Sequence, residues 1–238
     1  MATIIRGNMQ ETQQAYLLHS RPFKEHQLII DLLTQNDGKV SAVISSGHSL
    51  KANKKGILQP FSRFTIQLSG RHQLKKASQL ESLHQHKMLL GNSLYSGLYI
   101  NELLVKLLPE NIPCETLFEH YAQAIDCLDK SDTIEPILRK FEMQLLDELG
   151  FSLDFSVVSD SLNEQWQFIV EQGFVEANPS SKLPIFTRDD LLAIAVGNST
   201  TPNSLNTHKI LMRQMLNHLL GHKPLKSREL FMARDKKQ

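Results

Sequence analysis

The sequence predicts an α+β protein in which a small five-stranded β-structure, either a barrel or a sandwich, is followed by a mostly helical region. Two observations predict it. Short apolar runs separated by turn residues fill the chain from about residue 13 to residue 85, as in small all-β domains. Beyond about residue 86 the apolar residues recur with the period of a helix. We therefore expect a β-rich domain over residues 1–85 and a helical domain over residues 86–238.

Five candidate strands account for the first domain. They cover residues 13–21, 27–35, 40–46, 57–69 and 74–83. Asp37 and Gly38 lie between the second and third runs and indicate a tight hairpin, because both residue types tolerate a positive φ. Pro60 falls inside the fourth run and predicts a bend or an edge there.

Helical periodicity defines the second domain. We expect helices from about residue 91 to just before Pro109, over residues 115–128, 132–149 and 204–220, and a short one from Thr187 to about Gly197. Asp132 and Glu135 have the spacing of a capping box. Residues 151–186 form an irregular insertion with a short hairpin over residues 166–176, and the tail from His222 is basic.

Composition and motifs disfavour several classes of protein. No apolar run reaches the roughly 18 residues that a membrane-spanning helix needs, and the chain starts without the apolar stretch of a secretory signal. Cys114 and Cys127 are too far apart for a CxxC knuckle; a disulfide is permitted, but two reduced thiols are favoured. Phosphate-binding, zinc-protease and serine-hydrolase motifs are absent from the sequence. We therefore expect no catalytic residue, metal or cofactor.

Charge is divided unevenly along the chain. Residues 1–80 hold eleven Lys or Arg against four Asp or Glu, a net charge of +7, whereas residues 81–160 hold five against fourteen, a net charge of −9. The basic first third attracts a polyanion such as DNA, although a solubility bias would also produce such a surface. The candidate DNA-binding residues are Arg21, Lys24, Lys39, Lys51, Lys54, Lys55, Arg63, Arg71, Lys75 and Lys76.

Four aromatic residues lie among these charges. They are Tyr16, Phe23, Phe61 and Phe64. An exposed ring would stack on an unpaired base; core packing is the alternative for each ring and is favoured for Phe61 and Phe64. The densest cationic piece is KANKKG, residues 51–56, which either contacts phosphates or is an ordinary solvated loop.

Five segments, in the same order along nearly the whole chain, resemble the bacterial RecO family of recombination mediators. They are residues 17–25 (LLHSRPFKE), 56–61 (GILQPF), 94–104 (LYSGLYINELL), 138–149 (LRKFEMQLLDEL) and 221–231 (GHKPLKSRELF). Each is weak alone. Their combination, and the closeness of LYSGLYINELL to the family pattern, make the resemblance specific.

The resemblance implies an N-terminal OB-fold, a helical C-terminal domain and no catalytic turnover. Proteins of this family bind single- and double-stranded DNA and anneal complementary strands. With RecR they load the RecA recombinase on DNA coated by single-stranded-DNA-binding protein. The implied setting is DNA recombination and repair by the RecF pathway in the bacterial cytoplasm, at the nucleoid when the protein is on DNA.

Two departures from the family pattern affect the expected sites. Some relatives carry a cysteine-rich zinc site where residues 151–186 of this chain have no cysteine, so we expect no zinc there and a hairpin held by packing alone. Relatives also tend to carry Lys or Arg after the Gly-Lys turn, where this chain has serines and a histidine. We therefore expect Lys51, Lys54 and Lys55 to contribute more to DNA binding than the residues directly after that turn.

A second site is expected on the helices, for the acidic, phenylalanine-ended tail of single-stranded-DNA-binding protein. Such a tail requires an apolar slot with a cationic rim. The candidate residues are Arg139, Met143, Lys209, Met212 and Arg213. They form a slot only if their two helices pack together, and unrelated surface cations are the alternative.

Two functions from other classes give different expectations. An adaptor that recognises only proteins predicts weak DNA binding even at low salt. A metal-dependent nuclease predicts cleavage that requires Mg²⁺, but the sequence shows no carboxylates that converge on a metal pair.

Overall fold

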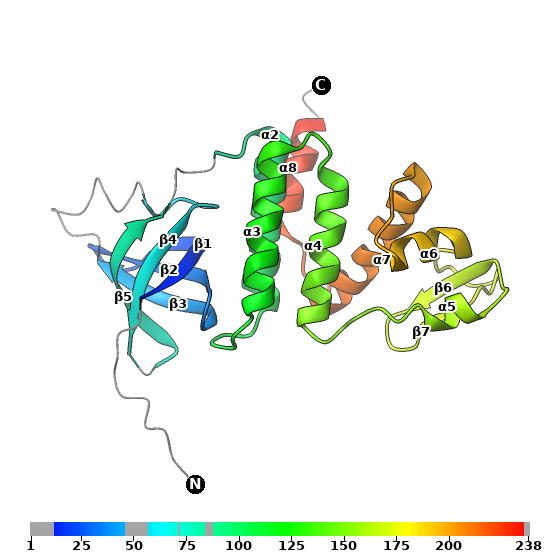
Figure 1. The fold of residues 1–238 in the computed structure, drawn as a ribbon, viewed down its shortest axis with the longest axis horizontal. Helices are drawn as coiled ribbons and strands as arrows, with labels where there is room; N and C mark the ends of the chain where they lie inside the picture. Colours follow the sequence, from blue (N-terminus) through cyan, green and yellow to red (C-terminus); the bar gives the residue numbers. More distant parts are fainter. Residues whose placement is uncertain (1–11, 46–56, 71, 84–87, 236–238) are drawn as a thin grey trace, which may run out of the picture. The chain divides into compact units, whose positions relative to one another are not determined.

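The computed structural model describes residues 12–45, 57–70, 72–83 and 88–235, with side chains to residue 230. The chain forms two compact units, Met1–Asp129 and Lys130–Gln238. Within these described ranges, the first contains a β-barrel and the helices α2 and α3, and the second contains the remaining helices and a small sheet (Figure 1).

A closed five-stranded barrel forms the start of the first unit, with the strand order β1-β2-β3-β5-β4. The strands are β1 (Thr12–Pro22), β2 (Gln27–Thr34), β3 (Gly38–Ser45), β4 (Arg63–Ser69) and β5 (Leu74–Ser82). Neighbours are antiparallel except β3 and β5, which are parallel. This arrangement is an OB-fold and confirms the predicted fold class.

The fourth strand begins later than the sequence suggested. Residues 57–62 do not belong to it, and β4 starts at Arg63. Phe61 has a φ of 67°, a left-handed conformation that does not occur in an extended strand. Pro60 makes only an isolated bridge with Leu17, so the chain bends at this proline, as Pro60 had indicated.

Alternate residues of the strands fill the barrel interior. The buried cluster consists of Ala15, Leu17, Ile30, Leu32, Ala42, Ile44, Phe64, Ile66 and Ala77. Their two-residue spacing is that of strands with one face in a core, so the barrel follows directly from the sequence pattern.

Two helices, α2 (Gly91–Leu107) and α3 (Glu115–Lys130), cover part of the barrel's outer surface (Figure 1). Tyr16 points outward from β1, yet it is buried, with ring centroids 5.3 Å from Phe118 and 4.9 Å from Tyr121 of α3. β1 is therefore buried on both faces, which explains its uninterrupted apolar run.

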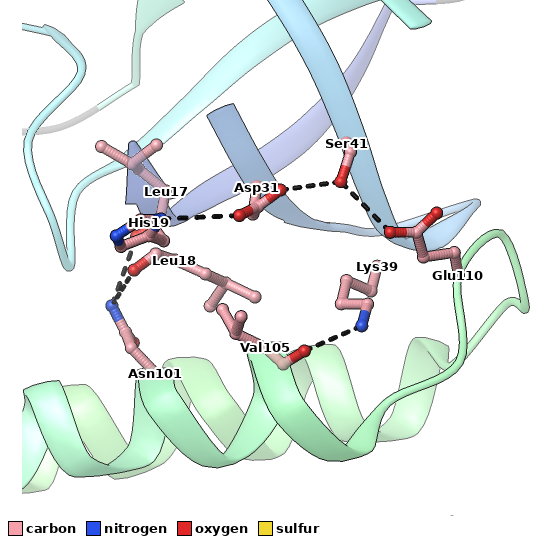
Figure 2. Close-up of polar contacts among 9 residues, drawn as sticks. All are labelled: Leu17, Leu18, His19, Asp31, Lys39, Ser41, Asn101, Val105 and Glu110. Carbon is pink, nitrogen blue, oxygen red and sulfur yellow. Dashed lines mark hydrogen bonds and ion pairs between the residues drawn. The ribbon is translucent and has the colours of Figure 1, made fainter. Parts of the chain in front are cut away.

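A buried asparagine joins both helices to β1. Asn101 of α2 donates its amide to the carbonyl oxygens of Leu17 and Leu18, with N···O distances of 3.4 and 3.1 Å (Figure 2). Its own carbonyl accepts a hydrogen bond of 2.8 Å from the Tyr121 hydroxyl. β1 has a bulge between Leu17 and His19, and Asn101 satisfies main-chain groups where the bulge interrupts the ladder.

A small residue of α2 admits a side chain from the bend before β4. A Cβ on Gly97 would lie 2.7 Å from Cε1 of Phe61 and 2.8 Å from Cδ1 of Leu89. Here the approaching group is the Phe61 ring, which explains why a glycine occupies this position.

The β2–β3 turn lies against the segment between α2 and α3. Gly38 has a φ of 68°, and a Cβ there would overlap the main-chain carbonyl of Ile112. The Asn111 N–H donates to the Lys39 carbonyl oxygen at 2.8 Å. Glycine is therefore required at residue 38 for its backbone conformation and for the space that Ile112 occupies.

Helices and a three-stranded sheet make up the second unit. They are α4 (Ile134–Glu148), α5 (Ser156–Asp160), β6 (Gln165–Ile169), β7 (Gly173–Glu176), β8 (Phe186–Thr187), α6 (Arg188–Ala195), α7 (Pro202–Leu219) and α8 (Lys226–Asp235).

The structure confirms the predicted elements that correspond to the helices α4, α6 and α7 and to the β6–β7 hairpin. The predicted capping box is wrong, because Thr133 precedes α4 and makes no side-chain cap. Sequence reasoning missed α8, whose apolar residues are few.

The hairpin is not held by packing alone, which corrects the expectation from sequence. The buried Gln167 amide donates to the carbonyls of Asn178 and Leu183, at 3.3 and 3.1 Å, and accepts from the Asn178 N–H at 3.1 Å. Arg188 donates to three carbonyls at the end of α5, those of residues 158, 159 and 161. These hydrogen bonds connect the irregular segments to the sheet.

None of the helices in the described ranges combines the length and the apolar character needed to cross a membrane.

We predict that Gly38→Ala lowers the free energy of unfolding by about 3 kcal/mol, because a Cβ overlaps the Ile112 carbonyl and strains the left-handed backbone. Urea denaturation measures this loss. Gly70→Ala is the matched control, since Gly70 also has a positive φ but no atom lies within 4 Å of its added Cβ. It should cost about 1 kcal/mol. Equal losses for the two variants would contradict the steric account.

Candidate nucleic-acid interface

The loop between β1 and β2 exposes cations beside an aromatic ring. Lys24 Nζ lies 5.4 Å from the Phe23 ring centroid, and Arg21 is exposed at the end of β1. The Phe23 N–H donates to the Gln27 carbonyl at 2.9 Å and closes the turn. We call Arg21, Phe23 and Lys24 the L12 tip. In OB-folds the loop at this place is one of those that bind oligonucleotides.

Lys39, by contrast, has a structural role. Its Nζ donates to the Val105 carbonyl oxygen at 2.9 Å (Figure 2), in the last turn of α2, where carbonyls lack helical partners. Burial lowers the pKa of Lys39, and the Glu110 and Asp31 carboxylates oppose that shift. Lys39 therefore caps a helix C-terminus, which takes the place of the phosphate contact expected from sequence.

Carboxylates surround this contact on the outer face of β2 and β3. The Ser41 hydroxyl oxygen lies 2.7 Å from Asp31 Oδ1 and 3.2 Å from Glu110 Oε1 (Figure 2). His19 Nδ1 lies 3.6 Å from the other Asp31 oxygen. The half of the β2–β3 hairpin that includes Asp31 and Ser41 is thus negatively charged and disfavours phosphate.

The Arg63 side chain also makes structural contacts within the first unit. Its guanidinium carbon lies 5.2 Å from the Phe118 ring centroid and 6.0 Å from that of Tyr16. Its Nη2 pairs with Glu119 Oε1 at 3.2 Å. These contacts join β4 to α3 and neutralise the cation.

Three of the four candidate stacking aromatics are core residues. Tyr16, Phe61 and Phe64 are buried. Core packing, which the sequence favoured for Phe61 and Phe64, is therefore confirmed for both. Phe23 is half-buried and is the one of the four that a base could reach.

Lys75 and Lys76 lie at the start of β5 and line a groove on the barrel. Lys75 donates to the Gly70 carbonyl at 3.1 Å, and Lys76 is exposed. The other predicted contacts lie outside the described residues: Lys51, Lys54, Lys55 and Arg71.

The helices of the predicted tail slot do pack together in the second unit. α4 contacts α7, and Lys209 of α7 pairs with Glu135 of α4 at 3.2 Å. Arg213 is exposed and Met143 is half-buried, but Met212 is wholly buried in the core. Met143, Lys209 and Arg213 are therefore the slot residues that a ligand could reach.

A buried polar group lies between the same two helices. Arg139 is 8% exposed, and its Nη2 contacts Oε1 of Glu142 at 2.9 Å. His208 of α7 is buried, with Nδ1 3.2 Å from the Ser199 hydroxyl. Burial and then the Arg139 charge lower the pKa of His208 to about 4. Arg139 is thus an internal residue paired with Glu142.

Sequence reasoning missed the buried polar residues Asn101, Glu142 and His208. Each lies on a helix face with apolar neighbours three or four positions away. A polar residue on the apolar face of a helix is expected to be buried, and this was the one signal that the sequence offered. Within the described ranges, no three histidine, cysteine or carboxylate side chains gather where they could hold a metal ion.

Comparisons with known proteins agree with this architecture. The family model described as "Recombination protein O N terminal" matches residues 9–86, and "Recombination protein O C terminal" matches residues 91–173. The DNA repair protein RecO of Cellvibrio japonicus is 39% identical over 230 residues, which cover 93% of this chain and 96% of that protein. The DNA repair protein RecO of Pseudomonas putida is 40% identical over 231 residues, covering 93% and 97%.

We predict that lowering the pH destabilises the second unit through His208. Because its folded pKa is depressed to about 4, the unfolded chain takes up a proton first as the pH falls below about 6.5. Stability is therefore retained above pH 6.5 and lost toward pH 4, by about 2 kcal/mol between pH 6.5 and pH 5. Urea denaturation of wild type and His208→Gln measures this, and the variant should lose less. His218→Gln, at an exposed position of the same helix, should keep the wild-type slope; a His208→Gln slope equal to wild type would contradict the assignment.

Proposed function

Because the chain belongs to the RecO family of DNA repair proteins, we propose that it is a recombination mediator that binds single- and double-stranded DNA and anneals complementary strands. It helps to load RecA on DNA coated by single-stranded-DNA-binding protein, together with RecR. It acts without catalytic turnover, in the bacterial cytoplasm and at the nucleoid when bound to DNA. The observation that carries the proposal is the L12 tip of an OB barrel, where two exposed cations lie beside a half-buried aromatic ring.

DNA contact begins at the L12 tip. Arg21 and Lys24 are exposed and can neutralise phosphates, and Phe23 offers the aromatic face on which an unpaired base stacks. OB-folds bind oligonucleotides on the face of the second and third strands and on adjoining loops. The tip adjoins the start of β2, so a strand that crosses this face meets it.

The course of DNA over the barrel is restricted to one half of the β2–β3 hairpin. The half that includes Asp31 and Ser41 lies beside α2 and carries carboxylates. The other half, where Gln27 pairs with Ser45 and Ile29 with Val43, adjoins the L12 tip. Lys51, Lys54 and Lys55 follow β3 in the sequence, and we include them among the phosphate contacts on the basis of sequence.

The mechanism is electrostatic. Cations along the barrel screen the repulsion between two DNA strands and leave the base edges accessible while they pair. This requires no bond chemistry, and the exposed cations named above suffice for it.

The helical unit captures the partner that coats the DNA. Lys209 and Arg213 provide a cationic rim and Met143 an apolar surface for the acidic, phenylalanine-ended tail of single-stranded-DNA-binding protein. Capture of the tail raises the effective concentration of the barrel at coated DNA, without any additional contact.

We predict that Arg21→Ala with Lys24→Ala weakens binding of a labelled single-stranded oligonucleotide and reduces the slope of log affinity against log salt by about 1.4, since two phosphate contacts are lost. Fluorescence anisotropy across a salt series measures both. Changing Lys51, Lys54 and Lys55 to Ala should reduce the slope by about 2.

The matched control is Lys140→Ala with Lys182→Ala, which removes two exposed lysines from the second unit and should keep the wild-type slope. Absence of binding by the wild-type chain at low salt would overturn the DNA-binding proposal and favour an adaptor that recognises only proteins.

A further inference from the structure

A groove of about 770 Å³ runs along the seam of the barrel, where β3 meets β5. Val43, Ile57, Leu74, Ala77 and Leu80 contribute apolar surface to it. The polar residues of its described lining are Gln27, Ser45, Ser69, Lys75, Lys76, Ser78 and Gln79. None of these side chains is aromatic and none is a carboxylate, so the described lining is aliphatic with a positive rim.

The groove exposes the edge of a strand. Every residue from Leu74 to Leu80 lines it, although successive side chains of a strand point to opposite faces. Only the edge of a strand can present both sets of side chains at once. β3 pairs with β5 at Leu74, Lys75 and Lys76 and no further, whereas β4 pairs with the opposite edge of β5 as far as Ser82.

The backbone of Ala77–Leu80 therefore has no strand partner on the groove side within the described ranges. Buried or half-buried main-chain groups are normally paired, and an open strand edge is a template for another strand. A bulge in β5, formed without a glycine, lies in the same stretch as the unpaired edge. Gln79 has a φ of 49°, and Gln79 and Leu80 together oppose one residue of β4, so β5 is bulged in the stretch that follows its pairing with β3.

We propose that this groove binds an extended acidic peptide of a partner protein, which adds as a strand to the Ala77–Leu80 edge of β5. The main chain of the peptide pairs with this edge, and its alternate side chains enter the aliphatic groove. The other set of peptide side chains faces Lys75 and Lys76. Because the described lining holds these two cations and no carboxylate, it favours acidic residues at those peptide positions. The peptide is a second ligand of the barrel, and its groove shares Gln27, Val43 and Ser45 with the half of the hairpin proposed for DNA.

The observations favour a peptide over single-stranded nucleic acid as the occupant. Nucleic acid is held chiefly by stacking on aromatic rings and by phosphate contacts, and the described lining contains no ring. An unpaired strand edge supplies donors and acceptors at the spacing of a polypeptide, about 3.3 Å per residue.

The test uses the full chain and a fluorescein-labelled peptide of about nine alternating aspartate and leucine residues, about 30 Å when extended. Anisotropy should show saturable binding. Two N-methylated versions, each blocking the amides of one peptide edge, separate main-chain pairing from side-chain attraction. At least one should bind about tenfold more weakly.

Leu74→Asp should weaken peptide binding by about tenfold, because it places a carboxylate in the groove. Leu83→Asp is the matched control: Leu83 is 39% exposed against 41% for Leu74, lies just beyond the end of β5 and does not line the groove. It should bind the peptide as wild type does.

Amide hydrogen exchange locates the ligand. The peptide should slow exchange over Ala77–Leu80. Three results overturn the proposal: absence of peptide binding, equal binding of both N-methylated peptides and the unmodified one, or protection of Ala77–Leu80 by a single-stranded oligonucleotide but not by the peptide. Oligonucleotide binding to the L12 tip is measured separately with the Arg21 and Lys24 variant, so failure of either proposal is recognised without the other.

Discussion

The first unit depends on the docking of the β2–β3 hairpin against the C-terminal end of α2. Lys39 reaches across to the Val105 carbonyl, and Gly38 leaves room for the Ile112 carbonyl beside it. A helix end leaves unpaired carbonyls, and a lysine beside them satisfies one hydrogen bond and complements the helix dipole. Because Lys39 is buried among the Asp31 and Glu110 carboxylates, its charge is also compensated. The barrel and the helices α2 and α3 are consequently one compact body.

This docking determines which parts of the barrel remain for ligands. It covers the half of the β2–β3 face that includes Asp31 and Ser41, and it leaves the L12 tip, the opposite half of the hairpin and the seam between β3 and β5. The seam itself reflects the same constraint. Main-chain contacts with residues 110–111 occupy the edge of β3 at Lys39, and β5 takes this edge only from Ser41 to Val43. Beyond Val43 the two strands separate and the groove opens.

The barrel could be predicted from sequence because alternating apolar residues and the Asp37-Gly38 turn are local signals. Candidate cations could be named, but their roles could not. Lys39 and Arg63 have the same residue types as Lys24 and Arg21, and their internal partners, Val105 and Glu119, lie more than 50 positions away. Burial of Asn101, Arg139 and His208 likewise depends on packing between elements, which periodicity does not reveal. The edge of β5 follows from strand pairing and has no sequence signal.

Comparison of Lys39→Met with Lys24→Met tests the central claim most directly, namely that two basic residues of the barrel have separate structural and DNA-binding roles. The account predicts that Lys39→Met lowers the free energy of unfolding by about 2 kcal/mol, since the Val105 carbonyl loses its hydrogen bond and the Asp31 and Glu110 carboxylates lose a nearby positive charge. Its affinity for a single-stranded oligonucleotide, measured by anisotropy well below the unfolding transition, should stay within about twofold of wild type. Lys24→Met should show the reverse, with unchanged stability and weaker DNA binding. A Lys39→Met variant as stable as wild type but deficient in DNA binding would contradict the account.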